Sequence, residues 1–229
     1  MPAETAVGVA ALCRACRMVP PGFVRAVSYG VYDGSMRAVI HALKFERMEP
    51  LVHQLGGMLA EVMSRFAQET PEGMLVIPVP LHAKRRAERG FNQAEALAAE
   101  ALLRLKKIHP AWRLEMDSGA LVRERRTESQ AGLTPRQRRQ NLRGAFFVPD
   151  PGPIARRHIL LVDDIYTTGA TGRACSKVLL KAGAASVRVA TLARAQRRFP
   201  VFVETRQRYM RVAESLEIPG NGFGNIFVH

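Results

Sequence analysis

The chain has 229 residues, and its hydrophobic content of 47% is sufficient to bury the core of one α/β domain with an appendage. No apolar run approaches the roughly 18 residues of a membrane span, and the N-terminus lacks a basic region followed by a long hydrophobic core. Membrane insertion is therefore not expected, and the expected compartment is the cytoplasm. The formal net charge of +14 indicates an anionic partner, for which phosphorylated metabolites and nucleic acid are both candidates.

The first 22 residues are predicted to form a small N-terminal appendage, and they contain the pair Cys13 and Cys16. Cys-x-x-Cys is one half of a zinc-ribbon pattern, whereas a tetrahedral structural zinc needs four ligands. Neither a second pair nor a nearby histidine is present, so this partial zinc site is not expected to be complete within the chain. Cys175 is the third cysteine, and three cysteines give no disulfide framework.

The main domain is predicted to span residues 23–198. Its first strand is expected at residues 27–32, where a short alternating pattern is followed by an Asp-Gly turn. Apolar residues at helical spacing then predict a short helix over residues 36–45 and a longer amphipathic helix over residues 51–66.

Residues 74–80 form the next predicted strand, which is apolar and closed by prolines. Pro78 and Pro80 have no amide donor, so the strand must stop or lie at a sheet edge there. A basic stretch at residues 82–93 follows and is predicted to be a loop, in which Gly90 permits a tight bend.

This basic loop leads into the clearest predicted helix of the chain, over residues 94–105, where apolar residues recur at i, i+3 and i+4 without a gap. A basic loop between a strand end and a helix start can hold a pyrophosphate through charge-assisted hydrogen bonds. An ordinary run of solvated charges is the alternative.

Residues 112–117 are predicted to be a polar connection, and residues 120–122 a short strand. The segment 123–143 is different in character because it is rich in arginine. Its seven arginines are Arg123, Arg125, Arg126, Arg136, Arg138, Arg139 and Arg143. It fits an exposed helix-turn, a mobile hood that closes over a pyrophosphate, or an electrostatic footprint for nucleic acid, and we rank the hood first. Residues 146–153 are expected to be a Pro/Gly-rich link.

A continuous apolar run at residues 159–162 predicts a strand that is buried on both faces, as in a parallel sheet covered by helices. Asp163 and Asp164 follow directly, so they fall at the carboxyl end of this strand, where open α/β sheets bind their ligands. The two acids are therefore the first candidates for a binding site.

A turn rich in hydroxyl groups follows the acids and opens a predicted helix over residues 170–182. Thr167, Thr168 and Thr171 supply hydroxyl donors, and Gly169 lets the backbone approach a ligand closely. Free amides and the positive dipole at the amino end of the helix make a natural phosphate site.

Gly183 is expected to end this helix, and the alternation at residues 185–192 predicts a further strand. A strand, a helix and a second strand in this order form a βαβ unit, in which the two strands are parallel. The predicted fold class is therefore α/β, with a parallel twisted sheet flanked by helices.

The stretch Asp163-Asp164-Ile165-Tyr166-Thr167-Thr168-Gly169-Ala170-Thr171 resembles the phosphoribosyl pyrophosphate (PRPP) motif of type I phosphoribosyltransferases. By this resemblance, Asp163 and Asp164 are the catalytic pair and hold the ribose hydroxyls. The residues implied in binding the 5′-phosphate are Thr167, Thr168, Gly169, Ala170 and Thr171. A strand end followed by a helix cap is the plainer alternative for the same residues.

Further motifs make the resemblance more specific. In chain order they are Tyr29-x-x-Tyr32, Leu43-Lys44-Phe45, Ile77-Pro78-Val79-Pro80, Arg89-Gly90-Phe91-Asn92-Gln93, Arg123-x-Arg125-x-Thr127-x-x-Gln130-x-x-Leu133 and Arg138-x-x-Asn141. Together with the PRPP motif they resemble the competence protein F (ComF) family, over about residues 23–195. Members of that family resemble phosphoribosyltransferases and are linked to DNA uptake in natural transformation.

Two features depart from the family pattern. ComF proteins usually begin with a zinc ribbon of two cysteine pairs, of which only Cys13 and Cys16 are present here. Residues 199–229 form a predicted C-terminal tail without a family pattern, and we assign it no function. The part between them, residues 23–198, is the predicted phosphoribosyltransferase-like domain.

The resemblance implies that the protein binds PRPP with Mg²⁺ and that pyrophosphate is displaced from ribose C1. Mg²⁺ would bridge oxygens of the pyrophosphate and the ribose, because this ion takes few protein ligands. Lys84, Arg85 and Arg89 are expected to face the pyrophosphate. The residues expected in the hood are Arg125, Arg138 and Arg139. No pattern indicates the acceptor of the ribosyl phosphate.

Two non-catalytic interpretations stay open beside a transferase. One is a competence factor that binds single-stranded DNA, works with DNA-uptake proteins, and uses the phosphate site as a sensor or for DNA phosphates. The other is a PRPP-sensing regulator, against which the lack of a recognisable helix-turn-helix counts. The sequence leaves the enzymatic activity and the oligomeric state open.

Overall fold

The computed structural model describes residues 16, 20–45, 50–124, 134, 137, 142, 144–195 and 227–228. Six strands in these regions form one sheet in the order β3-β2-β6-β7-β1-β8. They are β1 (Arg25–Val31), β2 (Met74–Pro78), β3 (Leu114–Met116), β6 (His158–Tyr166), β7 (Ser186–Arg194) and β8 (Phe227–Val228). Neighbouring strands are parallel, except that β8 runs antiparallel to β1. The predicted fold class, a parallel sheet flanked by helices, is confirmed.

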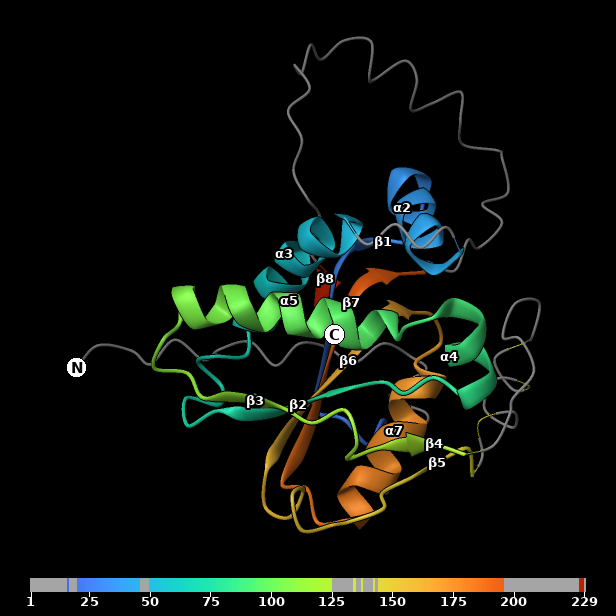
Figure 1. Cartoon of the computed structure of the whole chain (residues 1–229). Helices are drawn as coiled ribbons and strands as arrows, with labels where there is room; N and C mark the ends of the chain where they lie inside the picture. The colour runs from blue at the N-terminus through green and yellow to red at the C-terminus, as the bar shows by residue number, and fades with distance from the viewer. Residues whose placement is uncertain are drawn as a thin grey trace, which may run out of the picture.

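Helices lie on both faces of this sheet (Figure 1). They are α2 (Gly34–Phe45), α3 (Pro50–Ser64), α4 (Ala83–Arg89), α5 (Gln93–Ile108) and α7 (Ala170–Lys181). α3 and α5 cover one face, and α7 packs on the other beside an antiparallel ribbon of β4 (Val122–Arg123) and β5 (Phe146–Phe147). α2, α4 and the first turn of α7 gather at one end of the sheet (Figure 1).

The side chains of β6 alternate between two hydrophobic cores. Leu160 and Val162 belong to the core under α3 and α5, whereas Ile159 and Leu161 belong to the core under α7, and all four are fully buried. A strand covered on both faces is apolar at every position, so the continuous run predicted this central strand correctly. β6 continues beyond the run to Tyr166, which puts the two acids near its carboxyl end.

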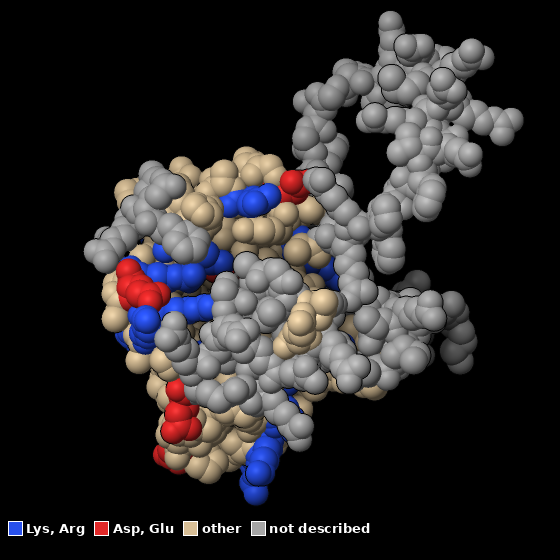
Figure 2. All heavy atoms as spheres, turned by 90° about the vertical axis from the view of Figure 1, so that its right-hand side faces the viewer, with Lys and Arg blue, Asp and Glu red and all other residues tan. Residues whose placement is uncertain are grey.

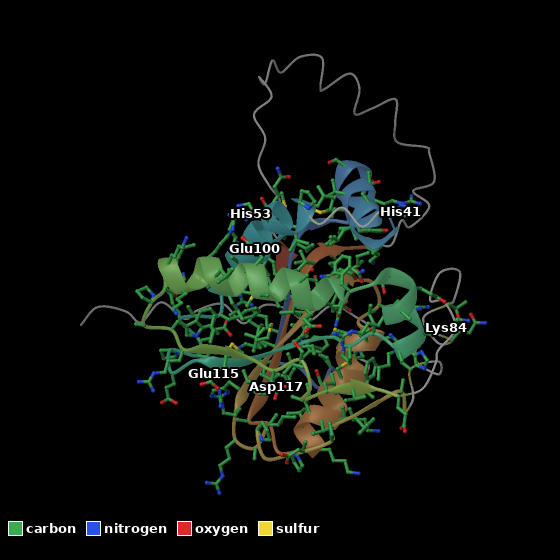
Figure 3. All side chains as sticks on the ribbon, in the orientation of Figure 1. His41, His53, Lys84, Glu100, Glu115 and Asp117 are labelled. Carbon is green, nitrogen blue, oxygen red and sulfur yellow. The ribbon has the colours of Figure 1, made fainter. Side chains whose placement is uncertain are left out.

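The two long helices α3 and α5 pack closely against each other. Gly56 and Gly57 of α3 are buried, and a Cβ at Gly56 would collide with the side chain of Glu100 on α5. A polar contact joins the same helices, because His53 Nδ1 lies 2.8 Å from Glu100 Oε1 (Figure 3). The predicted helices at residues 51–66 and 94–105 correspond to this pair, and the methionine-containing stripe of α3 is core.

The prediction of a basic loop over residues 82–93 is wrong in its first half. Residues 83–89 form the helix α4, whose first turn is capped by His82: the Lys84 amide donates to Nδ1 at 3.2 Å. Alanine, lysine, arginine and glutamate all favour helix, but the many charged residues led to the prediction of a loop. Gly90 ends α4 with a φ of 81°, which agrees with the tight bend predicted there.

Two short strands were also missed. The predicted polar connection at residues 112–117 contains the edge strand β3, in which Glu115 and Met116 are exposed, so the strand has no apolar run to identify it. Residues 146–147, predicted as a link, form β5 and pair with β4. β4 begins at Val122, the last residue of the strand predicted at residues 120–122. The prediction was displaced because a strand of two residues has too short a pattern to be located from the sequence.

The N-terminal appendage and the C-terminal tail are described only in small part. Cys16 is buried, and Arg173 Nη2 on α7 donates to its Sγ at 3.5 Å. Cys13 and most of residues 199–229 lie outside the described residues, so the zinc assignment and the predicted domain limits stay predictions. Among the described helices, none combines the length and apolarity needed to cross a membrane.

Gly73, just before β2, offers a test of the backbone that leads toward the candidate site. Its φ is +120°, and a Cβ there would collide with the carbonyl oxygen of Arg113, which accepts a hydrogen bond from the Met74 amide at 2.9 Å. We expect Gly73→Ala to lower the free energy of unfolding by about 2–4 kcal/mol in urea titrations. Gly34→Ala is the matched control, because φ is +47° there but no atom lies within 4 Å. It should cost about 1 kcal/mol, and equal losses would contradict the steric argument.

Candidate functional site

A cavity of about 320 Å³ opens at the carboxyl ends of β2 and β6. Parallel sheets bind ligands at the carboxyl ends of their strands because loops and helix amino termini meet there. The residues that line it are Tyr32, Lys44, Val79, Leu81, Arg85, Arg89, Asn92, Gln93, Ala94, Arg123, Asp163, Asp164, Ile165, Thr167 and Thr171. The fold therefore brings together residues of all three predicted sets. They are Asp163 and Asp164 of the predicted catalytic pair, Arg85 and Arg89 of the predicted pyrophosphate residues, and Thr167 and Thr171 of the predicted phosphate loop.

Asp163 lines the cavity and is half-buried in the folded chain. Its Oδ1 accepts a hydrogen bond from the Asp164 amide at 2.9 Å. Loss of solvent raises the pKa of Asp163 to about 7, the neighbouring charge of Asp164 adds to this rise, and the charge of Lys44 opposes it. Asp163 therefore changes its charge near neutral pH.

Asp164 is paired with a cation from another part of the chain. Lys44 Nζ, at the end of α2, lies 2.5 Å from Asp164 Oδ2. The two side chains are 17% and 14% exposed, so solvent screens this ion pair only weakly. The acidic pair thus consists of one carboxyl group in a short ion pair and one whose pKa is raised.

The turn after β6 has the backbone expected of a phosphate loop. Gly169 adopts a left-handed φ of 72°, and a Cβ there would collide with the hydroxyl of Tyr166. α7 starts at the next residue, and the Arg173 amide donates to the Gly169 carbonyl at 2.9 Å. Thr168 Oγ1 is buried and has no hydrogen-bond partner among the described residues, whereas Thr167 and Thr171 face the cavity.

α4 turns one face toward the cavity. Arg85 and Arg89 are one helical turn apart and both line it, and Arg89 Nη1 donates to Gln93 Oε1 at 3.0 Å. Burial lowers the pKa of Arg89, and the charge of Asp164 opposes this shift. Lys84, the third predicted pyrophosphate residue, is exposed on the outer side of α4 and does not line the cavity (Figure 3).

Arg123 is a buried cation that also lines the cavity. It is 8% exposed, and its guanidinium lies over the ring of Phe146, 5.4 Å from the centroid. Burial lowers the pKa of Arg123, and the charge of Arg85 adds to the lowering, so the two guanidinium groups repel each other across the site. On the face that carries α4, Lys and Arg side chains lie side by side with a few acids among them (Figure 2).

Comparison with known proteins shows to which family the chain is related. The DNA utilization protein YhgH of Escherichia coli O157:H7 is 37% identical over 186 residues, which cover 80% of this chain and 77% of that protein. Competence protein F of Haemophilus influenzae is 33% identical over 187 residues, covering 80% and 78%. The chain belongs to the ComF family.

More distant comparisons add little to this assignment. Competence protein ComFC of Bacillus subtilis is 32% identical over 165 residues, covering 71% of this chain and 61% of that protein. A hypoxanthine phosphoribosyltransferase of Staphylococcus aureus is 12% identical over 69% of this chain and 71% of its own, with a TM-score of 0.40. A structural likeness this loose identifies no activity. No protein-family model matches the chain.

Several wall residues of this ComF protein were not predicted. They are Tyr32, Lys44, Asn92, Gln93 and Arg123. Each belongs to a motif that supported the family resemblance. None was assigned to the site by itself, and Arg123 was named only as part of the segment interpreted as a hood, because the sequence did not indicate that these motifs meet at one cavity.

Some predicted residues lie outside the described part of the chain. Arg125, Arg138 and Arg139, assigned to the hood, are among them, so the hood stays a prediction. Among the described residues, no group of three His, Cys, Asp or Glu side chains is placed to hold a metal ion. Within the described part of the cavity, a cation would find two carboxyl groups, those of Asp163 and Asp164, and its other ligands would be waters or atoms of a bound molecule.

Asp163 gives the stability of the protein a defined pH dependence. Its pKa is about 7 in the folded chain against an ordinary value of 3.8, so the folded state binds this proton more tightly. The free energy of unfolding should therefore fall as the pH rises from about 4 to about 7, by at most ~1.4 kcal/mol per pH unit. Asp163→Asn should remove that slope, because the amide does not titrate while its oxygen still accepts from Asp164.

Urea unfolding of the wild type and of Asp163→Asn at several pH values from 5 to 8 measures the difference. The variant should gain stability relative to the wild type as the pH rises. Asp150→Asn, a change at an exposed acid, is the control and should leave the slope unchanged. Parallel curves for the wild type and Asp163→Asn would contradict the assignment.

Proposed function

We propose that this ComF-family protein binds PRPP together with Mg²⁺ in the cavity and acts, as a phosphoribosyltransferase-like protein, in DNA uptake during natural transformation. The observation that carries the proposal is the composition of the cavity wall. A pair of acids at a strand end, a glycine turn at a helix amino end and the basic face of α4 line one space. A sugar that carries phosphate groups at both ends needs these three kinds of partner.

The balance of charge favours a polyanion. Lys44, Arg85, Arg89 and Arg123 face the cavity from three separate elements, and their charges exceed those of the two acids. Arg85 and Arg123 repel each other, a cost that a bound anion between them would remove. A pyrophosphate group placed on this side would be neutralised as it departs.

The remaining groups would hold the sugar and its 5′-phosphate. Asp163 and Asp164 would accept hydrogen bonds from the ribose hydroxyls, and the 5′-phosphate would meet the amides at the start of α7 and the hydroxyls of Thr167 and Thr171. The buried Thr168 hydroxyl has no partner within the described chain, and a small movement of the turn would offer it one on the phosphate.

The donor atoms of the site fit Mg²⁺ that arrives with its substrate. The cavity offers carboxylate oxygens from Asp163 and Asp164 only, and Mg²⁺ characteristically combines few carboxylates with substrate phosphates and waters. When bound, Mg²⁺ would offset the charge that develops on the pyrophosphate as it leaves ribose C1. The chain itself would position the ribose and the two phosphate ends. The acceptor that takes the ribosyl phosphate is not assigned.

Titration calorimetry with PRPP and Mg²⁺ tests the proposal directly. The wild type should bind, and the double variant Asp163→Asn, Asp164→Asn should lose binding by at least about 100-fold, because both acceptors of the ribose hydroxyls lose their charge. The variant should stay folded in thermal unfolding. An unchanged titration with the double variant would refute the assignment of the acids.

A pair of changes on α4 serves as the internal control. Arg85→Ala removes a cation that lines the cavity and should weaken PRPP binding roughly tenfold. Lys84→Ala removes a neighbouring cation on the exposed outer side and should change the affinity by less than about twofold. Equal losses would mean that net charge, and not the cavity, sets the affinity.

The names of the relatives favour a second candidate function, since a DNA utilization protein and competence proteins are among them. In this alternative the protein is a non-catalytic factor that binds single-stranded DNA through the same phosphate site. The affinity for an oligonucleotide, measured by fluorescence anisotropy, should then fall steeply between roughly 50 and 200 mM salt. PRPP with Mg²⁺ should also compete. DNA binding that PRPP leaves unchanged would separate the DNA contact from the cavity.

A further inference from the structure

The proposed function uses Lys44 only as one of the cations that face the cavity and does not explain its ion pair with Asp164. It belongs to the Leu43-Lys44-Phe45 motif and lies in the last turn of α2, far in the sequence from the PRPP-like motif. α2 nevertheless delivers this side chain to the cavity, where Nζ lies 2.5 Å from Asp164 Oδ2. Holding a flexible lysine in one geometry costs side-chain entropy, so a contact of this kind needs a strong partner.

The ion pair determines the charge of the acidic pair. Without Lys44, the two adjacent carboxyl groups would present up to two uncompensated negative charges to the cavity at alkaline pH, which is an attractive position for a divalent cation. With Lys44 in place, one of these charges is already compensated at short range. A divalent ion that approached Asp164 would meet the ammonium group, and the two positive charges would repel each other in a poorly screened site.

We infer that Lys44 occupies the position of a cation on Asp164 and thereby prevents the acidic pair from binding a divalent metal ion by itself. A divalent ion then enters the cavity only together with an anion that brings further oxygen ligands. This inference deepens the proposed function and rests on it, since PRPP is such an anion. In this role Lys44 is a positioning and selectivity residue: it excludes the free divalent ion and admits the ion that is bound to an anion.

Binding of Mn²⁺ alone, without PRPP, tests this role. The signal of free Mn²⁺ in electron paramagnetic resonance is recorded against protein concentration at pH 8 for the wild type, Lys44→Met and Lys44→Arg. Lys44→Met should bind one Mn²⁺ at least about tenfold more tightly than the wild type, because the repelling charge is gone while the side chain keeps a similar length. Lys44→Arg keeps the charge and should behave as the wild type does.

The double variant Lys44→Met, Asp164→Asn identifies where the added ion binds. It should lose the gain, because the acceptor carboxylate is gone. Equal Mn²⁺ affinity of the wild type and Lys44→Met would overturn the inference, and so would a gain that survives in the double variant. If thermal unfolding with EDTA shows that Lys44→Met does not fold, Lys44→Gln takes its place.

This test is independent of the test of PRPP binding. PRPP is absent from every Mn²⁺ titration, so a protein that fails to bind PRPP would still reveal whether Lys44 excludes the metal ion. Conversely, PRPP binding by the wild type with no change in Mn²⁺ affinity in Lys44→Met would leave the proposed function in place and remove only the role of Lys44.

Discussion

The parallel pairing of β2 with β6 is the constraint on which the candidate site depends. Pro78 lies opposite Val162 in the register, and the Val79 amide donates to the Val162 carbonyl at 2.8 Å. β2 therefore ends level with Val162, just before the two acids of β6, although the two strands are far apart in the chain. α4 starts just after one strand and the glycine turn just after the other, so basic and acidic groups meet at one sheet edge. The two prolines fix this level, because they offer no further amide to the ladder.

The charged groups of the site lower the stability of the fold. Asp163 loses solvent beside another acid, and Arg123 is buried over an aromatic ring near a second guanidinium group. Removing charges from water is expensive, and hydrophobic side chains of similar volume would often stabilise a fold equally well. Groups with perturbed pKa values that gather at a cavity are therefore more easily understood as part of a binding site than as structural supports.

The sequence predicted those parts of the molecule that depend on local pattern. The central strand, the helix after it and the acids between them all followed from the apolar run and the turn chemistry at residues 159–171. α4 was missed because its helix is almost entirely polar, and β3 because an edge strand needs no apolar run. Lys44 and Arg123 reach the cavity only through tertiary packing, which no periodicity in their own segments encodes. The hood residues lie outside the described chain, and their assignment stays a prediction.

The small ribbon of β4 and β5 has a consequence for the evolution of this family. The Glu124 amide donates to the Ala145 carbonyl at 3.1 Å, so the backbone positions on the two sides of the arginine-rich stretch lie next to each other. The entropy of closing such an excursion grows only slowly with its length. Insertions, deletions and exchanges between those two anchor points are therefore tolerated without disturbing the sheet. Relatives can therefore differ in the length of this stretch while the sheet and the cavity at its end stay the same.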